Sequence, residues 1–311
     1  MKFFSPFRSW LIGLAGGQDA ENTRQSGERV TVLESIASHF VLLCAVAFAL
    51  YPVLWVASQA FSGTSAPSAR VLPVPEYPTL DHFKAVVSTS KTTPDGTVWL
   101  FGRQLANSIV VALATASVGV LIAVPAAYAL ARFKFLGKEQ GVKALLATQM
   151  FPTVASAIPL YLLLDRLGML NSRTGLVLCY ASTSVPFSIF QLRAAFEAIP
   201  VDLEEAAMVD GATRFEAFLR VVLPAARPAI AVTALFAFMS AYNEFILAAT
   251  LLSKEDMFTL PVVLQRYIGE YDAQWENFAA GALIVSVPVM ALFYIAQRHL
   301  VAGLTAGGVK G

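Results

Sequence analysis

Charged residues are scarce in this chain of 311 residues, and their scarcity indicates its class. Only 14% of the residues are Asp, Glu, Lys or Arg, whereas 57% are hydrophobic, which gives a mean hydropathy of +0.63. A soluble domain carries about 25% charged residues. The net charge of +1 gives no basis for nucleic-acid binding. The composition therefore predicts a membrane protein.

Motifs for catalysis and for metal binding are missing as well. The sequence has no G-x-x-x-x-G-K-S/T phosphate-binding loop and no nucleophile elbow, so we expect no ATP hydrolysis and no enzyme activity. The histidines, His39, His82 and His299, are far apart and form no metal-ligand spacing. Cys44 and Cys179 lie in apolar stretches, which predicts small buried residues and no disulfide. No metal or cofactor is therefore expected on this chain.

Long apolar runs are abundant, and six of them can span a bilayer, which takes about 20 residues. Most of these runs contain no Asp, Glu, Lys or Arg, and the run at 228–253 contains only Glu244. They predict an all-α membrane protein with six transmembrane helices. We expect these helices near residues 36–60, 105–131, 144–164, 174–193, 228–252 and 277–297.

Positive charge predicts the orientation of these helices. If the loops alternate between the two sides of the membrane, fourteen Lys and Arg residues lie on one side and eight on the other. The richer side is the cytoplasmic one. Both termini and a loop at about 198–227 are therefore expected in the cytoplasm, and loops 61–104 and 253–276 on the opposite side.

The cytoplasmic loop contains the most informative segment, EEAAMVDGATRFEAFLRVVLP at residues 204–224. Asp202 and Glu205 have the spacing of a capping box, which predicts a short helix that begins near Leu203. Gly211 is expected to end this helix, because glycine adopts left-handed backbone angles at low cost.

A second short helix is expected directly after this glycine. Thr213 and Glu216 repeat the capping-box spacing, and Pro224 is expected to stop the helix. Its apolar stripe consists of Phe215, Phe218, Leu219 and Val222. An ordinary amphipathic connector would also carry acids at its helix N-termini, because the helix dipole favours them there.

The spacing in this segment is similar to that of a known family. From Glu205 it fits E-A-A, three residues, Gly, nine residues, an aliphatic, one residue and Leu-Pro. This resembles the cytoplasmic EAA loop of ABC-importer permeases, which fits an ATP-hydrolysing subunit. The resemblance implies that ATP and Mg are bound by partner ATPase subunits. It implies an ATPase-coupling loop formed by Glu204, Glu205, Ala206, Ala207, Asp210, Gly211, Leu223 and Pro224.

Other segments narrow the resemblance to the carbohydrate-uptake branch. AAYALARFKFLGK at 126–138 looks like the end of the second conserved helix of sugar permeases, and AYNEFIL at 241–247 is similar to their W-N-E-F pattern. The ending at 297–311 closely resembles that of MalG-type permeases of maltose/maltodextrin importers. The resemblance covers about 36–311 and implies the type I ABC-importer permease fold. It departs in the N-terminal tail and in loop 61–104.

Two further contact sites are implied by the resemblance alone. In that family the C-terminal tail inserts between the ATPase subunits, although glycine-rich C-termini are commonly disordered. The matching tail residues are Gly303, Leu304, Thr305, Gly307 and Gly308. Part of the outer loop reaches the solute-binding protein, although solvated charge is the simpler interpretation of this acidic segment. The matching loop residues are Val262, Gln265, Tyr267 and Tyr271.

Glu244 is the one ionisable residue expected deep in a span. Such residues are costly in lipid and usually face a cavity or a partner. It could bind a sugar hydroxyl or an ion, but we favour a structural carboxylate, which its neighbours Tyr242 and Asn243 could satisfy by hydrogen bonds.

The predicted organisation is a cytoplasmic tail (1–35), a six-helix permease domain (36–302) and a cytoplasmic C-terminal tail (303–311). The resemblance implies a multi-pass protein of the bacterial inner membrane that imports maltose, maltodextrin or a similar oligosaccharide. Its expected partners are a second, different permease, two ATPase subunits, a periplasmic or lipid-anchored solute-binding protein and membrane lipid. The alternatives are a permease of the same fold for another solute, a stand-alone secondary transporter or a membrane-embedded enzyme.

Overall fold

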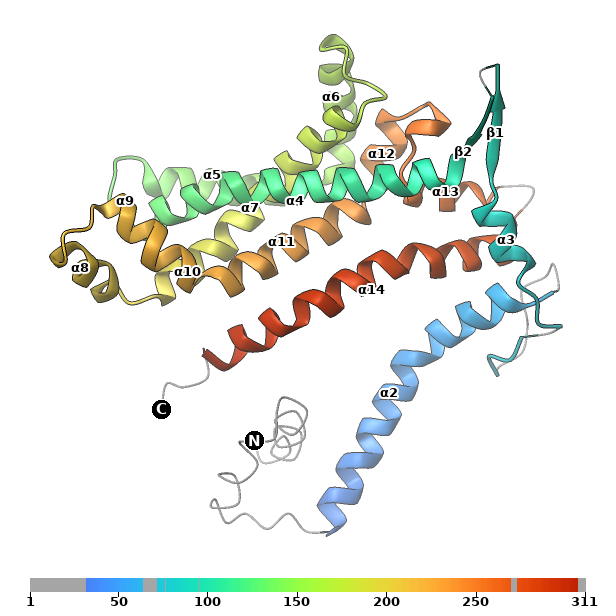
Figure 1. Ribbon diagram of the computed structural model, residues 1–311, viewed down its shortest axis with the longest axis horizontal. Helices are drawn as coiled ribbons and strands as arrows, with labels where there is room; N and C mark the ends of the chain where they lie inside the picture. The colour runs from blue at the N-terminus through green and yellow to red at the C-terminus, as the bar shows by residue number, and fades with distance from the viewer. Residues whose placement is uncertain (1–31, 64–71, 76, 95, 270–272, 307–311) are drawn as a thin grey trace.

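The computed structural model describes residues 32–63, 72–75, 77–94, 96–269 and 273–306 of the chain. Most of these residues are helical (Figure 1). The longest helices are α2 (Val32–Phe61), α4 (Leu100–Arg132), α7 (Arg173–Ala198) and α14 (Trp275–Ala306). The shorter helices are α3 (Asp81–Val87), α5 (Lys138–Met150), α6 (Thr153–Arg166), α8 (Asp202–Val209), α9 (Arg214–Ala217), α10 (Leu223–Ala225), α11 (Arg227–Tyr242), α12 (Ile246–Leu251) and α13 (Leu260–Arg266).

The helices that can cross a membrane agree only partly with the predicted six. Within the described ranges, four helices are long and apolar enough, namely α2, α4, α7 and α14, and the number rises to six if each of two bent helix pairs is one crossing. One pair is α5 with α6, bent by 99°, and the other is Arg214–Ala225 with α11, bent by 71°. The helical class is confirmed, and the count lies between four and six.

The third predicted helix, near 144–164, is broken in the structure. α5 ends at Met150, and α6 begins at Thr153. Pro152 accounts for the break, because a proline disfavours the helical conformation of the residue before it. Phe151 has an extended backbone accordingly, with φ −81° and ψ 125°.

The fifth predicted helix, near 228–252, is also not continuous. α11 ends at Tyr242, and α12 begins only at Ile246. The intervening residues, 243–245, are not helical. Glu244 therefore lies in a helix break and not inside a helix.

The core is built around α4, which packs along α7 and α11. Small side chains on α4 allow this close packing, since Ala112, Ala123 and Ala127 are fully buried. A Cβ placed on Gly119 would lie 3.7 Å from Ser184 Oγ of α7. The helices beside α4 are thus held near its backbone along most of its length.

α2 leaves this bundle, as Figure 1 shows, and packs against α14 at its own C-terminal end. The most apolar part of α2 is not buried within this chain. Cys44 is consequently exposed, so the prediction that it is buried is wrong, whereas Cys179 on α7 is buried as predicted.

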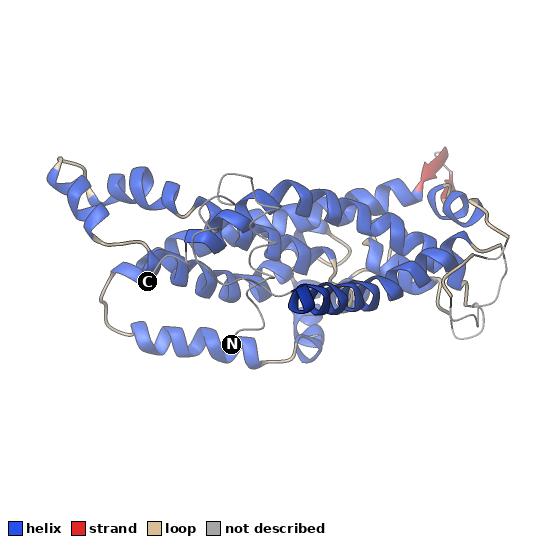
Figure 2. Cartoon of the chain, turned by 90° about the horizontal axis from the view of Figure 1, so that it is seen from below, coloured by secondary structure: helices blue, strands red, loops and turns tan. Residues whose placement is uncertain are grey.

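Loop 61–104 adds a feature that the all-α prediction lacks. Strands β1 (Ser90–Thr93) and β2 (Gly96–Trp99) form an antiparallel hairpin in which Ser90 pairs with Trp99. The strands lie at one end of the elongated molecule (Figure 2). This hairpin marks the end of the bundle opposite to α8 and α9 (Figure 1).

Candidate coupling site

The predicted cytoplasmic loop forms a helical projection at one end of the bundle (Figure 1). It consists of α8, a tight turn, α9, a π-helical segment at Phe218–Val222, and α10. The predicted order of helix, glycine turn and helix is therefore present. α14 runs toward the same end of the molecule.

α8 begins at Asp202, close to the predicted start, but without the predicted capping box. The residue that precedes the helix is Val201, which has helical backbone angles and provides no side-chain cap. Asp202 instead lies in the first turn, where the helix dipole still favours its negative charge. The predicted cap by Asp202 is thus wrong.

Gly211 ends α8 as predicted. Its φ of +91° lies in the left-handed region, which is cheap only for glycine. The N–H of Gly211 donates to Met208 O at 3.1 Å, and the N–H of Ala212 donates to Ala207 O at 3.0 Å. These two bonds form a Schellman motif, which satisfies the last carbonyls of the helix.

The start of α9 also agrees with the prediction. Thr213 and Glu216 form a complete capping box, in which the Glu216 N–H donates to Thr213 Oγ1 at 3.2 Å and the Thr213 N–H donates to Glu216 Oε2 at 2.9 Å. The two loop helices are therefore fixed relative to each other by local interactions on both sides of Gly211.

The predicted apolar stripe of the second helix divides into two sets. Phe218 and Val222 are buried against α4 and α7, whereas Phe215 and Leu219 are exposed. Leu203 and Val209 of α8 are exposed as well, and Val209 is 87% exposed. We call these four exposed residues the apolar loop surface: Leu203, Val209, Phe215 and Leu219.

Pro224 does not stop the helix as predicted. The chain remains helical to Ala225 and turns only before α11. The π-helical segment explains this, since the N–H of Leu223 donates to Phe218 O, five residues back. Pro224 then falls in the first turn of α10, where a missing N–H is tolerated.

Glu204, which was predicted to belong to the coupling loop, is buried and does not lie on the loop surface. Its side chain is only 6% exposed and accepts hydrogen bonds from Tyr128 Oη at 2.8 Å and from Arg132 Nε. Arg132 Nη2 also donates to Ile199 O at 2.7 Å. This buried ion pair joins α8 to the C-terminal end of α4.

This ion pair was not predicted from the sequence, in which Arg132 counts only as a cytoplasmic charge. The other predicted coupling residues remain accessible. Glu205, Ala206, Asp210 and Gly211 are exposed, and Ala207, Leu223 and Pro224 are half-buried. The loop therefore presents Glu205 and Asp210 to solvent next to the apolar loop surface.

The predicted binding-protein loop is only partly accessible. Val262 is 7% exposed and packs in the core, so it presents almost no surface to a binding protein. Val262 is buried because it lies in α13 (Leu260–Arg266), which packs on α4 and α14. Gln265 is exposed and Tyr267 is half-buried, whereas Tyr271 lies outside the described residues.

The outer loop is anchored to the bundle by residues that the sequence analysis did not single out. Asn107 of α4 donates from Nδ2 to Asp256 O at 2.8 Å and to Phe258 O at 3.1 Å. Asn171 Oδ1 accepts from the N–H groups of Ser253 and Lys254, at 2.6 and 3.0 Å. For Asn107, an uncharged polar residue at the start of a long apolar run was the available signal.

Glu255 connects this loop to the hairpin. Its carboxylate accepts from Lys91 Nζ of β1 at 2.7 Å and from Arg266 Nη1 of α13 at 3.1 Å. Hydrogen bonds from Lys91 and Arg266 hold the pKa of Glu255 below its ordinary value of 4.5. The carboxylate therefore stays charged over a wider acid range than a free one.

Acidification is expected to loosen the hairpin. Because the pKa of Glu255 is lower in the folded chain, its contribution is complete above pH 4.5 and is lost as the pH falls through the lowered pKa. Amide hydrogen exchange of β1, corrected for its intrinsic pH dependence, should accelerate over that range. Glu255→Gln should abolish this pH dependence. If the exchange of β1 in the unchanged protein did not vary with pH, Glu255 would not stabilise the hairpin.

Glu244 has the structural role that we favoured, but with other partners. Its Oε1 accepts from the Leu247 N–H at 2.9 Å, and its Oε2 accepts from the Ala248 N–H at 3.1 Å. It thereby satisfies the free N–H groups at the start of α12. The predicted partner Tyr242 instead donates to Val285 O at 3.0 Å, and Asn243 is exposed.

The C-terminal segment is helical for longer than predicted. α14 continues to Ala306 and includes Gly303, Leu304 and Thr305, which were assigned to the C-terminal tail that follows the predicted last helix. Gly307 and Gly308 lie outside the described residues.

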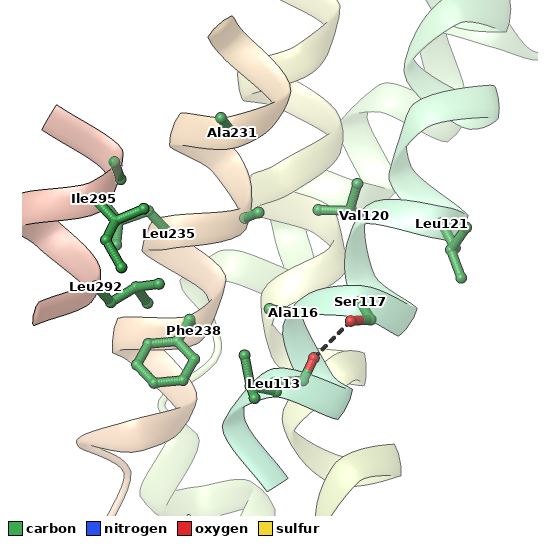
Figure 3. Close-up of a pocket in the computed structure, with 12 residues that line it drawn as sticks. Leu113, Ala116, Ser117, Val120, Leu121, Ala231, Leu235, Phe238, Leu292 and Ile295 are labelled. Carbon is green, nitrogen blue, oxygen red and sulfur yellow. Dashed lines mark hydrogen bonds between the residues drawn. The ribbon is translucent and has the colours of Figure 1, made fainter. Parts of the chain in front are cut away.

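An apolar pocket of about 590 Å³ lies between α4, α11 and α14 (Figure 3). Leu113, Leu235 and Phe238 are among its lining residues. Of the lining residues, only Ser117 carries a hydroxyl, which donates to Leu113 O at 2.8 Å. The pocket thus offers little to a polar ligand.

Comparisons with known proteins agree with this geometry. The family described as "Binding-protein-dependent transport system inner membrane component" matches residues 117–306. The chain is 37% identical over 290 residues to a maltose/maltodextrin transport system permease protein MalG of Vibrio parahaemolyticus, covering 88% of this chain and 95% of that protein.

Two further relatives have similar coverage. The galactooligosaccharides transport system permease protein GanQ of Bacillus subtilis is 34% identical, over 88% of this chain and 95% of its own length. The trehalose transport system permease protein SugB of Mycobacterium tuberculosis is 35% identical, over 86% of this chain and 94% of its own length.

The fold agrees with a solved structure as well. A chain of a bacterial ABC transporter involved in the import of the acidic polysaccharide alginate matches with a TM-score of 0.68 and 27% identity, over 86% of this chain and 96% of that chain. The exposed loop at 200–226 lies within the residues that match the family. This chain belongs to the family of inner-membrane components of binding-protein-dependent transport systems.

Proposed function

We propose that this chain is the permease subunit of an ATP-driven importer for maltose, maltodextrin or a similar neutral oligosaccharide. The carrying observation is the loop at 200–226, whose accessible acids and apolar loop surface stand at one end of the bundle. Such a projection fits a cleft in a separate ATPase subunit, which would bind ATP and Mg. The chain itself contributes no catalytic group.

The proposed topology is six crossings of a bacterial inner membrane with both termini in the cytoplasm. The crossings are α2, α4, α5 with α6, α7, α11 with α12, and α14. This arrangement leaves α8, α9 and α10 on the side that is richer in Lys and Arg. It also places β1, β2 and α13 on the outer side, where a solute-binding protein would dock near Gln265 and Tyr267.

The proposed cargo class follows from the relatives. Those proteins are named for maltose/maltodextrin, galactooligosaccharides and trehalose, which are all uncharged sugars. A second, different permease subunit would complete the sugar pathway, as the resemblance to maltose-type importers implies. Two ATPase subunits would bind on the cytoplasmic side.

Coupling would proceed through the buried ion pair. Closure of the ATPase subunits would move α8 and α9 together, because Gly211 and the capping box of Thr213 fix their angle. Glu204 would transmit this movement to α4 through Arg132, and α4 packs on both α7 and α11. Nucleotide binding and pathway opening would thus be linked as one two-state change.

The test is the ATPase activity of the purified assembly. The chain, co-purified with its partner permease and ATPase subunits, should hydrolyse ATP faster when a sugar-loaded binding protein is added. The chain alone should neither hydrolyse ATP nor move sugar. Robust ATP hydrolysis by the single chain, or stimulation only by a non-sugar solute, would contradict the proposal.

A further inference from the structure

α4 carries three buried polar residues near its N-terminal end, which is the end beside the β-hairpin (Figure 1). They are Gln104, Asn107 and Ser108, and each is at most 3% exposed. Their spacing of i, i+3 and i+4 places them on one face of the helix. Polar groups are costly to bury unless they are hydrogen-bonded. We call these three residues the outer clamp.

The two outer members of the clamp bind the ends of one segment, 255–260, which leads into α13. Gln104 Nε2 donates to Glu255 O at 3.0 Å. Ser108 Oγ accepts from the Leu260 N–H at 2.7 Å. Leu260 is the first residue of α13, so Ser108 satisfies one of the free N–H groups at the start of that helix.

Asn107, in the middle of the clamp, uses its amide on both sides. Its two N–H groups donate to Asp256 O and Phe258 O, and its Oδ1 accepts from Arg173 Nε of α7 at 2.8 Å. Carbonyl oxygens only accept and a guanidinium only donates, so these partners fix the orientation of the amide. An apolar side chain could form none of these bonds. Asn107 therefore joins the outer loop to both α4 and α7.

The opposite end of α4 is anchored in a comparable way, by the buried pair of Arg132 with Glu204 of α8. With 33 residues, α4 is about 50 Å long, which exceeds the hydrocarbon core of about 30 Å. One helix thus connects the loop at 200–226 to the segment 255–260 (Figure 1), and buried polar contacts hold both connections.

α14 offers a second connection to α13, but of a different kind. A Cβ placed on Gly281 of α14 would lie 2.6 Å from Leu264 Cδ2 of α13, so these two helices touch through apolar groups. Packed apolar surfaces can slide in small shear movements, whereas hydrogen bonds require a fixed direction. A movement of α4 should therefore carry α13 with it, while α14 can move separately.

We propose that Asn107 is a positioning residue for coupling, which holds segment 255–260 and thereby α13 on α4, so that engagement of the solute-binding protein at α13 is linked to the loop at 200–226. This assignment rests on the proposed function, which places α13 on the outer side. Asn107 acts through the exposed residues of α13, such as Gln265, and does not itself touch the binding protein.

The first measurement is ATP hydrolysis by the whole complex, with and without maltose-loaded binding protein. Asn107→Leu removes the amide and should lower the stimulation by the binding protein about tenfold, since more than one hydrogen bond is lost. Ser108→Ala is a milder change, which removes one bond and should lower the stimulation about threefold. Basal hydrolysis and complex assembly should not change in either variant.

Thr115→Val is the matched control. Thr115 is also fully buried on α4, but its Oγ1 has no hydrogen-bond partner among the described residues. The substitution keeps the shape of the side chain and removes only this hydroxyl. Stimulation should remain at the wild-type value. An equal loss in Thr115→Val and Asn107→Leu would show a general effect of buried polar groups on α4 and would overturn the assignment.

The second measurement tests the clamp without sugar or binding protein. Amide hydrogen exchange of residues 255–266 in the purified complex should be about tenfold faster in Asn107→Leu, because the segment opens more easily once its bonds to α4 are lost. Exchange in Thr115→Val should equal that of the wild type. Unchanged exchange in Asn107→Leu would mean that Asn107 does not hold the segment.

Three further results would also overturn the assignment. Faster exchange with normal stimulation would mean that the clamp is not part of the coupling path. An equal fall of basal and stimulated hydrolysis would mean that Asn107 supports only the folded structure. A wild-type complex that no sugar-loaded binding protein stimulates contradicts the proposed function itself, and it is distinguishable because the exchange measurement still shows whether Asn107 holds the segment.

Discussion

Replacing Glu204 by Gln is expected to destabilise the chain by about 3 kcal/mol and to abolish sugar uptake. The substitution keeps the shape of the side chain but leaves the buried guanidinium of Arg132 without its counter-charge. Loss of one partner of a buried ion pair typically costs about 3–5 kcal/mol. Thermal unfolding of the purified chain, together with uptake by the complex, measures the two effects.

Glu197→Gln is the control for this prediction. Glu197 pairs with Arg193 one turn away at 2.7 Å, but its side chain is 45% exposed. An exposed pair of this kind contributes at most about 0.5 kcal/mol, so this variant should remain close to wild type. If Glu204→Gln and Glu197→Gln behaved alike, the buried pair would not be the connection between α8 and α4.

Replacing Gly211 by Val is expected to stop transport while the chain still inserts in the membrane. Gly211 has φ +91°, and no atom lies within 4 Å of a Cβ built there. The expected effect is therefore backbone strain of at least about 1 kcal/mol and not a clash within this chain. The turn between α8 and α9 should open, which would misplace Glu205 and the apolar loop surface. ATPase co-purification and uptake are the measurements.

Gly137→Val separates the strain from the proposed docking role. Gly137 has φ +86° and equally open surroundings, but it precedes α5 and not α9. It should therefore suffer a similar backbone strain and yet retain the ATPase subunits. If Gly211→Val retained both its ATPase subunits and its uptake rate, the loop would not be the coupling element.

The parts of the fold that follow from local interactions could be predicted from the sequence. The positive φ of Gly211 and the capping box of Thr213 and Glu216 each depend on a few neighbouring residues. The approximate positions of α2, α4, α7 and α14 follow from long apolar runs. Such runs are unfavourable in water and therefore lie in a bilayer or a protein core.

The parts that depend on distant contacts could not be predicted. Glu204 and Glu205 are adjacent acids, and only the position of Arg132 at the end of α4 decides that the first is buried and the second exposed. Likewise, Val262 is buried because α13 packs on α4 and α14. Neither contact has a signature in the local sequence.

The helix breaks lie between these two cases. Pro152 is a local signal for the bend after α5, but prolines inside α2, α7 and α14 cause no such break. Surrounding packing decides which prolines interrupt a membrane helix. The break at Glu244 depends on its carboxylate capping α12, and a single acidic residue in an apolar run does not reveal such a cap.

The most direct measurement of the proposed function is accumulation of radiolabelled maltose in sealed proteoliposomes that contain the whole complex. With the binding protein outside and ATP inside, maltose should accumulate above its external concentration, and accumulation should stop without ATP. Vesicles assembled without this chain should accumulate none. Maltose uptake that needs no ATP, or that continues without this chain, would contradict its assignment as the permease of an ATP-driven importer.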